Sequence, residues 1–600
     1  MGIVVSAALH GGAALILLAA LSLIGSFAVG RWPLAVERRA VISIPASLAI
    51  GSLLVGWTSY LAGTFLGTWS ILPLFAILTL ASLIHVRAWG RDVMRCLARL
   101  AALAKANPLA TAALALISLL VVPQLLLPLV DSDGLAYHVA LPKLYVLTGH
   151  VWFVPWTVTG ALVQSMEMIY LIGFRLAGGE TAKFLHFGYF LASLATLALA
   201  VHRGRRMRAA AMLAPVLYAA APVVLAPAGA AFVDHAATFF VLAGALILFR
   251  RGPALLAGIA LGAAIAAKIT VAPAVVGLFV WATFDGRKPV FHRAVAIAVS
   301  VMVAFLPFGL RNVRHTGDPI YPLGYVLLHR DVPGITADRV AYAAQFHSSV
   351  PGPLGIAWTL DSEHVQADEV AGLHHAVGLL ALALAIRFRW TRRWLAPIVP
   401  CLIVALVFRP PTRYYLPMFA ALAALEAYAL VLLVRRLATF MAIAAAAPAV
   451  IAAAIPMLTF ARPAELLLGR MNRDAYLTRH VPGFAAAQVI NRQPPGGWVM
   501  ALDFPAPYYF DRPWIAEGVL NDPPLGRWIA EARSADEVVR RLHANDVRYL
   551  VITPGYGSGT RNALLPLARD RRQAEIIVAL RRRLVFLANV DRVDVLAVGR

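Results

Sequence analysis

The sequence predicts an α-helical polytopic membrane protein with about 14 transmembrane helices and a small C-terminal α/β domain outside the cytoplasm. Hydrophobic residues make up 60% of the 600-residue chain and charged residues only 14%, whereas soluble domains are about half apolar and a quarter charged. Apolar runs of about 17–25 residues, the length that crosses a bilayer, follow one another as far as residue 460. Beyond that point charges become frequent, which indicates a domain outside the membrane.

Each predicted span is an apolar run bounded by polar or basic residues. Two neighbouring runs, 254–267 and 270–284, are short enough to form a single tilted span. Basic residues flank the pair on both sides, which favours two crossings, because basic loops collect on one side of a membrane. The spans are predicted at residues 3–29, 41–66, 70–86, 108–130, 181–201, 209–227, 233–249, 254–267, 270–284, 292–310, 372–386, 394–408, 414–434 and 437–460.

Lys and Arg are concentrated in alternate loops between these spans. The positive-inside rule places such loops in the cytoplasm, so both termini and the loop after residue 130 are expected outside. The same loops account for the net charge of +23. Since no basic domain with interleaved aromatic residues occurs, nucleic acid is not an expected partner. The apolar segment 162–176 cannot cross without inverting every later span, so it is predicted as an interfacial helix on the outer surface.

The C-terminal residues 461–600 show the patterns of a small α/β domain. Short apolar runs at 498–502, 547–552 and 593–598 predict buried strands. Ser534 followed by Glu537 is a capping box, which predicts a helix over 535–543. Two cysteines in the whole chain are too few for a disulfide framework or a cysteine-based metal site.

The main candidate site is the stretch VDSDGLAYHVALPKLY, residues 130–145, which follows an apolar run. Asp131 and Asp133 have the spacing that can hold a divalent cation through oxygen ligands, or that lets one carboxylate act as a general base. A membrane helix can also end in polar residues simply on reaching water. His138 is either a site residue or a hydrogen-bonded structural histidine, and Lys143 either pairs with a phosphate or extends to the membrane interface.

Other ionisable residues are predicted at the same outer boundary. Asp234 begins a span, where a carboxylate either caps the helix or joins the Asp131 site. Lys268 lies between two apolar runs, while Arg311 and Arg413 each lie at the outer end of a span. Several cations at one membrane face suit an anionic lipid head group, although each alone is equally an anchor. Glu167 lies in the half-apolar segment after the two aspartates, where Arg175 is an alternative partner.

The pattern around these residues resembles the GT-C superfamily of membrane glycosyltransferases, in particular the protein O-mannosyltransferases and lipid A aminoarabinose transferases. The matching stretches lie within about residues 108–435. One departure concerns the aspartates: mannosyltransferase-like enzymes often carry an Asp-Glu pair where this chain has Asp-Ser-Asp, which leaves metal dependence open. The stretches are DSDGLAYHVALPKLY, Glu167, VDHAATFF, the turn at Lys268, TGDPIYP around Asp318 and RYYLP at Arg413.

The resemblance implies a GT-C-like fold and a polyprenyl-phosphate-linked sugar as donor. The sugar would pass to an unidentified acceptor on the outer side of a bacterial inner membrane. Asp131 is then the expected general base, and Asp133 orients it, the acceptor, or a divalent cation such as Mg²⁺ or Mn²⁺. The expected substrate-binding residues are His138, Lys143, Glu167, Asp234, Lys268, Arg311 and Arg413.

The expected division of the chain follows from the same reading. Residues 1–107 form leading spans, 108–460 a catalytic membrane region with outer loops 131–180 and 311–371, and 461–600 the outer domain. Two other functions fit a polytopic chain: a lipid or polysaccharide transporter or flippase, and a non-catalytic scaffold of cell-envelope assembly. A transporter would place ionisable residues inside its spans, whereas most of those named here lie at span ends.

Overall fold

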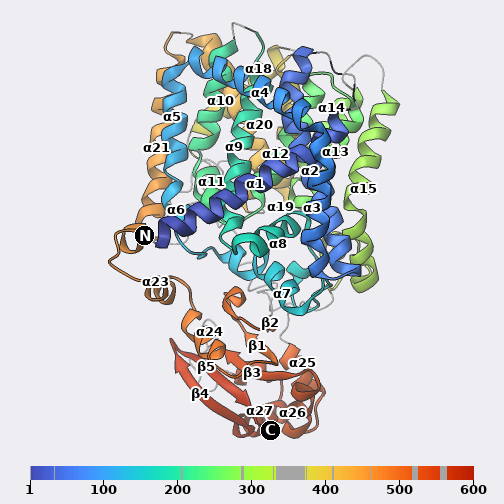
Figure 1. The fold of residues 1–600 in the computed structure, drawn as a ribbon, viewed down its shortest axis with the longest axis vertical. Helices are drawn as coiled ribbons and strands as arrows, with labels where there is room; N and C mark the ends of the chain where they lie inside the picture. Colours follow the sequence, from blue (N-terminus) through green and yellow to red (C-terminus); the bar gives the residue numbers. More distant parts are fainter. Residues whose placement is uncertain are drawn as a thin grey trace.

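The bundle of helices and the sheet that follows it are seen in a computed structural model (Figure 1). The structure describes residues 2–599 except 31, 33, 35, 205–206, 285–289, 329, 333–371, 373, 389, 409–410, 435, 460, 517–523 and 554–563. The outer loop predicted at 311–371 therefore lies largely outside the described residues. The sheet forms a separate layer beyond one end of the bundle.

The bundle is built from apolar helices of different lengths, several of which end at Pro or Gly. Its helices are α1 (Gly2–Gly30), α2 (Val36–Phe65), α3 (Ile71–Ser82), α4 (Val86–Ala106), α5 (Pro108–Leu119), α6 (Val122–Leu126), α7 (Ala140–Thr148), α8 (Ser165–Ala177), α9 (Thr181–Val201), α10 (Arg208–Ala220), α11 (Pro222–Leu225), α12 (Asp234–Phe249), α13 (Ala254–Ala267), α14 (Ala272–Phe284), α15 (Phe291–Thr316), α16 (Leu323–Leu327), α18 (His374–Arg387), α19 (Leu395–Phe408), α20 (Leu416–Leu433) and α21 (Ala438–Thr459).

The helices confirm a polytopic membrane protein but not the expected number of spans. Among the described residues, 8 helices are long and apolar enough to cross a membrane, or 9 if α10 and the segment after it, bent by 80°, form one broken span. The helices α12, α13 and α14 are apolar but shorter. A sequence reports where apolar runs lie, whereas a break such as the one before Pro222 decides how many separate rods they form.

The interfacial helix expected near residues 162–176 is instead a buried one. Helix α8 covers Ser165–Ala177, and its residues from Ser165 to Gly173 are buried against other helices. Its start contacts α2 so closely that a Cβ atom at Gly56 would lie 2.3 Å from the Ser165 hydroxyl oxygen. Amphipathicity alone cannot separate a helix on a membrane surface from one covered by protein, because both need one apolar face.

Close helix contacts depend on glycine in this bundle. A Cβ at Gly25 of α1 would lie 1.8 Å from the Ser47 carbonyl oxygen, and one at Gly51 of α2 would lie 1.7 Å from that of Leu21. Helices in membranes gain little from the hydrophobic effect and rely on this kind of close packing. The pair α1 and α2 therefore forms a tightly joined unit.

The C-terminal domain holds a five-stranded mixed sheet in the order β2-β1-β3-β5-β4. Strand β1 pairs in parallel with β2 and β3, and β5 is antiparallel to β3 and β4. The strands predicted at 498–502, 547–552 and 593–598 are confirmed. The strands are β1 (Trp498–Leu502), β2 (Trp514–Ala516), β3 (Val547–Ile552), β4 (Leu584–Val590) and β5 (Val593–Val598).

Alternate side chains of this sheet pack into two different cores. Met500, Leu550 and Leu596 face a core shared with α25 (Pro524–Glu531), α26 (Ala535–Ala544) and α27 (Arg571–Arg583). The opposite face, with Val499, Val551 and Val595, belongs to the same core cluster as the bundle. Three short helices connect the bundle to the sheet along the chain: α22 (Pro463–Leu467), α23 (Arg473–His480) and α24 (Phe484–Asn491).

The predicted helix after Ser534 is confirmed as α26. The Ser534 hydroxyl accepts a hydrogen bond from the Glu537 amide at 3.3 Å. The Glu537 carboxylate accepts from the Arg533 amide at 2.9 Å, one residue earlier than a capping box requires. The cap by Ser534 is therefore formed as predicted, but the Glu537 side chain bonds to the amide of Arg533 and not to that of Ser534.

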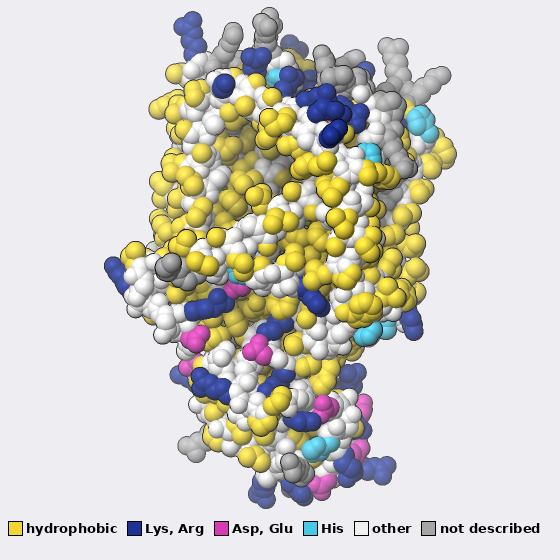
Figure 2. All heavy atoms as spheres, in the orientation of Figure 1, with side chains coloured by type: hydrophobic (Ala, Val, Ile, Leu, Met, Phe, Trp, Pro, Cys, Tyr) yellow, Lys and Arg dark blue, Asp and Glu magenta, His cyan; other side chains and the backbone are white. Residues whose placement is uncertain are grey.

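Basic side chains gather at the end of the bundle that lies opposite the sheet domain (Figure 2). Between that end and the sheet, the visible face of the bundle is largely hydrophobic. Charged groups of both signs then appear where bundle and sheet meet. This is the distribution expected of a membrane protein whose basic end and sheet domain lie on opposite sides of a bilayer.

Candidate active site

The loop with Asp131 lies where the bundle meets the sheet domain. After α6 the chain turns through a single π-helical turn, Gly134–His138, before α7 begins. The Asp131 carboxylate accepts the Gly134 amide at 3.0 Å, and a Cβ atom at Gly134 would lie 2.0 Å from that carboxylate. Glycine at this position therefore lets the backbone close around Asp131. Such π-helical turns are frequent at functional sites.

A buried lysine of α9 holds the segment just before this loop. The Lys183 ammonium donates to the Leu127 carbonyl at 2.7 Å and also to the carbonyl of Gln124. Burial raises the pKa of Asp131 above its ordinary value, and the positive charge of Lys183 opposes this rise only in part. A carboxyl group with a raised pKa is better suited to accepting a proton than an ordinary one.

Asp133 is in a different electrostatic state from Asp131. Its carboxylate accepts the Arg413 guanidinium at 2.7 Å and the Tyr137 hydroxyl at 2.9 Å. Burial alone would raise the pKa of Asp133, but Arg413, followed by His138 and Lys268, outweighs burial and lowers the pKa. The two aspartates of one short motif therefore differ in basicity, and Asp133 stays charged.

A second ion pair, between Asp234 and Lys268, lies beside the first. The Lys268 ammonium is 2.7 Å from Asp234 and 4.8 Å from the centre of the Tyr414 ring. Lys268 interrupts the run from α13 to α14, and Asp234 begins α12. Arg413 lies 5.9 Å from the centre of the same Tyr414 ring. The tyrosine thus links the two pairs through cation–π contacts.

His138 and Glu167 form a buried pair under this cluster. The His138 Nδ1 atom is 2.6 Å from the Glu167 carboxylate, so Glu167 pairs with His138 and the alternative partner Arg175 is not used. Among the described residues, His138 Nε2 and the second Glu167 oxygen lack hydrogen-bond partners. Two buried polar atoms without partners are costly in a folded protein, and such atoms collect at sites that bind other groups.

Two of the expected substrate-binding residues, Lys143 and Arg311, make contacts away from the two aspartates. The Lys143 ammonium lies 2.8 Å from Asp511 of the C-terminal domain and 2.9 Å from the Tyr508 carbonyl. Arg311 donates to the Leu162 carbonyl at 2.7 Å and to its neighbour Asn312. Lys143 lies in the middle of α7, and Arg311 lies five residues before the end of α15. Sequence position places them at a boundary, but it cannot tell which of several neighbours a long side chain reaches.

Three residues near the aspartates were not anticipated. Lys183 lies inside an apolar helix, and an ionisable residue at such a position is itself a signal of a site. Tyr414 is adjacent to Arg413 in RYYLP. Tyr509 comes from the C-terminal domain, and its hydroxyl donates to the Leu129 carbonyl at 2.6 Å, two residues before Asp131. Nothing in the sequence around Tyr509 indicates that contact.

Asp131 and Asp133 are bonded to donor groups of the protein itself, an arrangement that fits a divalent-cation site poorly. Each carboxylate already accepts a hydrogen bond from a protein donor, and Arg413 supplies positive charge next to Asp133. A Mg²⁺ or Mn²⁺ ion ligated by both aspartates would have to displace the guanidinium from its carboxylate.

The fold is similar to that of solved structures of the kind that the motifs predicted. No family model and no curated protein matches the sequence. ArnT from Cupriavidus metallidurans in the apo state has a similar structure, with a TM-score of 0.51 and 16% identity over 81% of this chain and 96% of ArnT. The similarity covers more of the chain than residues 108–435, which the motifs indicated.

Two further solved structures resemble the chain at lower scores. ArnT from Cupriavidus metallidurans bound to undecaprenyl phosphate gives a TM-score of 0.49 and 16% identity over 82% of this chain and 98% of that one. The apo oligosaccharyltransferase of Archaeoglobus fulgidus gives 0.44 and 14% over 78% and 72%.

Proposed function

We propose that the protein is a glycosyltransferase that moves a sugar from a polyprenyl-phosphate donor to an acceptor hydroxyl group. The observation that carries the proposal is the grouping of Asp131, the Asp133–Arg413 pair and the Asp234–Lys268 pair at one end of a GT-C bundle. A base and two cations in one place match the needs of a displacement at a sugar phosphate. ArnT of Cupriavidus metallidurans, which shares the fold, has also been solved with undecaprenyl phosphate bound.

Each group has a role in the proposed reaction. Asp131 accepts the proton of the acceptor hydroxyl group while the oxygen of that hydroxyl group forms a bond to the anomeric carbon of the sugar. The bond from that carbon to the phosphate oxygen breaks, and its electron pair stays with the polyprenyl phosphate. Arg413 and Lys268 stabilise the negative charge that grows on this leaving group. Asp133 holds Arg413 in place through the ion pair at 2.7 Å.

The direct test is transfer of a labelled sugar from a synthetic polyprenyl-phosphate donor by the purified chain in lipid vesicles. Transfer to an acceptor, or slow hydrolysis of the donor without one, supports the proposal. A flippase would instead move the labelled donor between leaflets and release no polyprenyl phosphate. A scaffold would do neither with any donor in a panel of sugars.

The proposed location is a bacterial inner membrane, with the C-terminal domain outside the cytoplasm. The basic end of the bundle, which lies opposite the sheet (Figure 2), supports this orientation. We expect a reporter fused after residue 206 to be cytoplasmic and one fused after residue 470 to be outside. Activity of paired reporters, one working only in the cytoplasm and one only outside it, measures this. The same side for both fusions would contradict the proposed topology.

Transfer should depend on pH through Asp131. Only the carboxylate form accepts a proton, and burial raises the pKa of Asp131 above the ordinary 3.8. The rate is therefore expected to fall on acidification at a pH higher than 3.8. In Asp133→Asn the fall should move to lower pH, because the negative charge of Asp133 contributes to the raised pKa. The pH dependence of turnover at saturating donor, measured for the wild type and for Asp133→Asn, tests this. If the rate falls at the same pH in both proteins, the fall does not come from Asp131.

The C-terminal domain should contribute no catalytic carboxylate. Asp511→Asn removes one partner of the Lys143 pair, whose Asp511 side chain is 70% exposed. An exposed pair of this kind contributes about 1 kcal/mol or less, so transfer should change by less than about fivefold. Lys143→Met should have an equally small effect on the KM for donor. Loss of transfer by a folded Asp511→Asn protein would place a catalytic carboxylate in this domain.

A further inference from the structure

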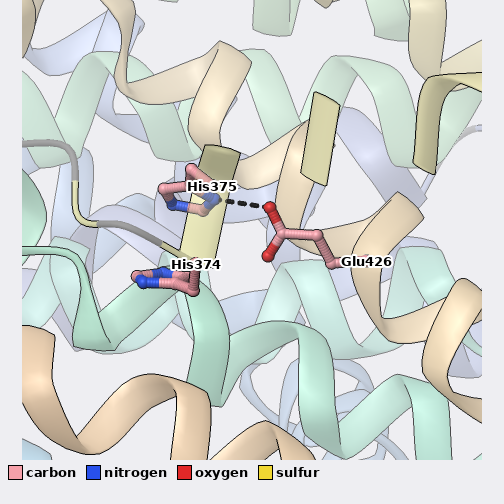
Figure 3. A group of neighbouring side chains, drawn as sticks. All are labelled: His374, His375 and Glu426. Carbon is pink, nitrogen blue, oxygen red and sulfur yellow. Dashed lines mark hydrogen bonds and ion pairs between the residues drawn. The ribbon is translucent and has the colours of Figure 1, made fainter. Parts of the chain in front are cut away.

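A second group of ionisable side chains lies inside the bundle, away from the proposed reaction. His374 and His375 stand at the start of α18, and Glu426 faces them from α20 (Figure 3). All three are buried, with exposed fractions of 5%, 3% and 5%. Glu426 follows Arg413 by 13 residues, which corresponds to roughly 20 Å along a helix. The group is therefore separate from the Asp131 site.

The three side chains have donor atoms placed for a shared ligand. One nitrogen from each histidine and one Glu426 oxygen all lie within 4.8 Å of one another. His375 Nδ1 is 2.7 Å from Glu426 Oε1, as Figure 3 shows. Among the described residues, His374 Nδ1, His375 Nε2 and Glu426 Oε2 are buried without hydrogen-bond partners. Three such atoms in one group are unusual unless a further ligand satisfies them.

The hydrogen bonds around His374 orient it as metal-binding histidines are oriented. Its Nε2 atom is 2.9 Å from the Leu217 carbonyl oxygen, which can only accept a hydrogen bond. Nε2 therefore carries the proton, and Nδ1, which has no hydrogen-bond partner among the described residues, is the nitrogen of the neutral ring with a free lone pair. A histidine that ligates a metal almost always donates its other N–H to a carbonyl or carboxylate in this way.

The surroundings of His375 and Glu426 keep these side chains in place. The Phe419 ring stacks on His375, with ring centres 5.2 Å apart. Gly378 lies one turn after the histidines, where a Cβ atom would be 1.9 Å from Glu426 Oε1. The position must lack a side chain for the carboxylate to reach His375. Phe419 and Gly378 thus both help to hold His375 and Glu426 in contact.

We infer that His374, His375 and Glu426 bind a divalent transition-metal ion, with Zn²⁺ the best match. Two imidazoles and one carboxylate are a ligand set that Zn²⁺ favours, and three protein ligands leave a fourth position for water. Mg²⁺ and Ca²⁺ prefer all-oxygen sites and fit less well. Binding requires neutral imidazoles and an ionised Glu426, so a proton held on the Glu426 carboxyl group would leave to solvent. The ion would fasten α18 to α20 and, through His374, to α10.

Metal content of the purified full-length protein tests this inference directly. The detergent-solubilised chain is stripped with EDTA, incubated with ZnCl₂, desalted and measured by elemental mass spectrometry. We expect about one Zn²⁺ per chain for the wild type. His375→Ala and Glu426→Gln should each lose the ion. Loss of a residue that only hydrogen-bonds to a metal ligand lowers metal affinity by about 10–100-fold, and loss of a ligand itself should lower it further. His150→Ala, which removes an exposed histidine, is the matched control and should keep it.

Asp133→Asn distinguishes this site from the two aspartates of the proposed active site. It should retain the Zn²⁺, because Asp133 belongs to the other group. Equal metal content in the wild type, His375→Ala and Glu426→Gln would overturn the inference, and so would a metal-free wild type. If the two variants fail to give a monodisperse protein, Co²⁺ titration of the wild type decides. Visible absorption bands of a four-coordinate Co²⁺ site, competed away by Zn²⁺, support the site, and their absence refutes it. Neither readout depends on transferase activity.

Discussion

Asp131→Asn is expected to lower sugar transfer by about 10²–10⁴-fold, the usual effect of losing a general base. The amide has the shape of the carboxylate, and its oxygen can still accept the Gly134 amide that lies 3.0 Å from Asp131. The loop should therefore keep its conformation, so expression and donor binding should remain near those of the wild type. Turnover at saturating donor, measured in lipid vesicles beside the binding of a labelled donor, separates these two effects.

The matched control for this substitution is Asp133→Asn. Asp133 is tied to Arg413 and Tyr137 and has a lowered pKa, so we expect it to orient groups and not to accept the proton. Its loss should raise the KM for donor and lower the rate less than Asp131→Asn does. Near-normal turnover in both variants would refute the catalytic role of the motif and favour a scaffold.

Arg413→Ala is expected to have the second largest effect, and to act in two ways. It leaves the carboxylate of Asp133, whose side chain is 18% exposed, without its cation. Breaking one side of a buried ion pair destabilises a protein by about 3–5 kcal/mol. It also removes a charge-assisted contact to the donor phosphate, which should weaken donor binding by roughly 10–100-fold.

The double variant Arg413→Ala with Asp133→Asn separates stability from binding. Removing both charges should restore most of the thermal stability, because no unpaired carboxylate remains. Donor affinity should stay low, since the contact to phosphate is still absent. Thermal unfolding in detergent and donor binding in vesicles give the two quantities. Recovery of both together would mean that Arg413 serves only to neutralise Asp133, and the phosphate role would be withdrawn. Lys268→Ala leaves Asp234 without its cation. It should lower both thermal stability and donor affinity, as Arg413→Ala does.

Much of the architecture could be predicted because it depends on local patterns. Long apolar runs mark buried or membrane-spanning helices, and short apolar runs mark buried strands such as Val547–Ile552. The motif at Asp131 and Asp133 could be singled out because carboxylates at the end of an apolar run are costly. The break at Pro222 and the burial of α8 could not, since both depend on the neighbours that surround a segment.

The chemical difference between the two aspartates could not be predicted from the sequence. It depends on Arg413, which is 280 residues from Asp133 along the chain, on Lys183 of α9, and on Lys268 between α13 and α14. Lys143 and Arg311 show the same limit, because each lies at the expected boundary but is bound to groups other than the aspartates. Sequence patterns locate a charged residue at a membrane face, whereas the identity of its partner is a property of the assembled fold.

The sheet whose two faces enter different cores has a consequence for cooperativity. One face shares a core with the bundle, and Tyr509 holds the Leu129 carbonyl directly beside the Asp131 loop. Local unfolding of the sheet would therefore expose part of the bundle's own core and release that loop at the same time. Backbone amides around Asp131 should then exchange with solvent through the same opening events as those of β1. We therefore expect the described part of the C-terminal domain and the Asp131 loop to open together, although a change in composition separates them along the chain.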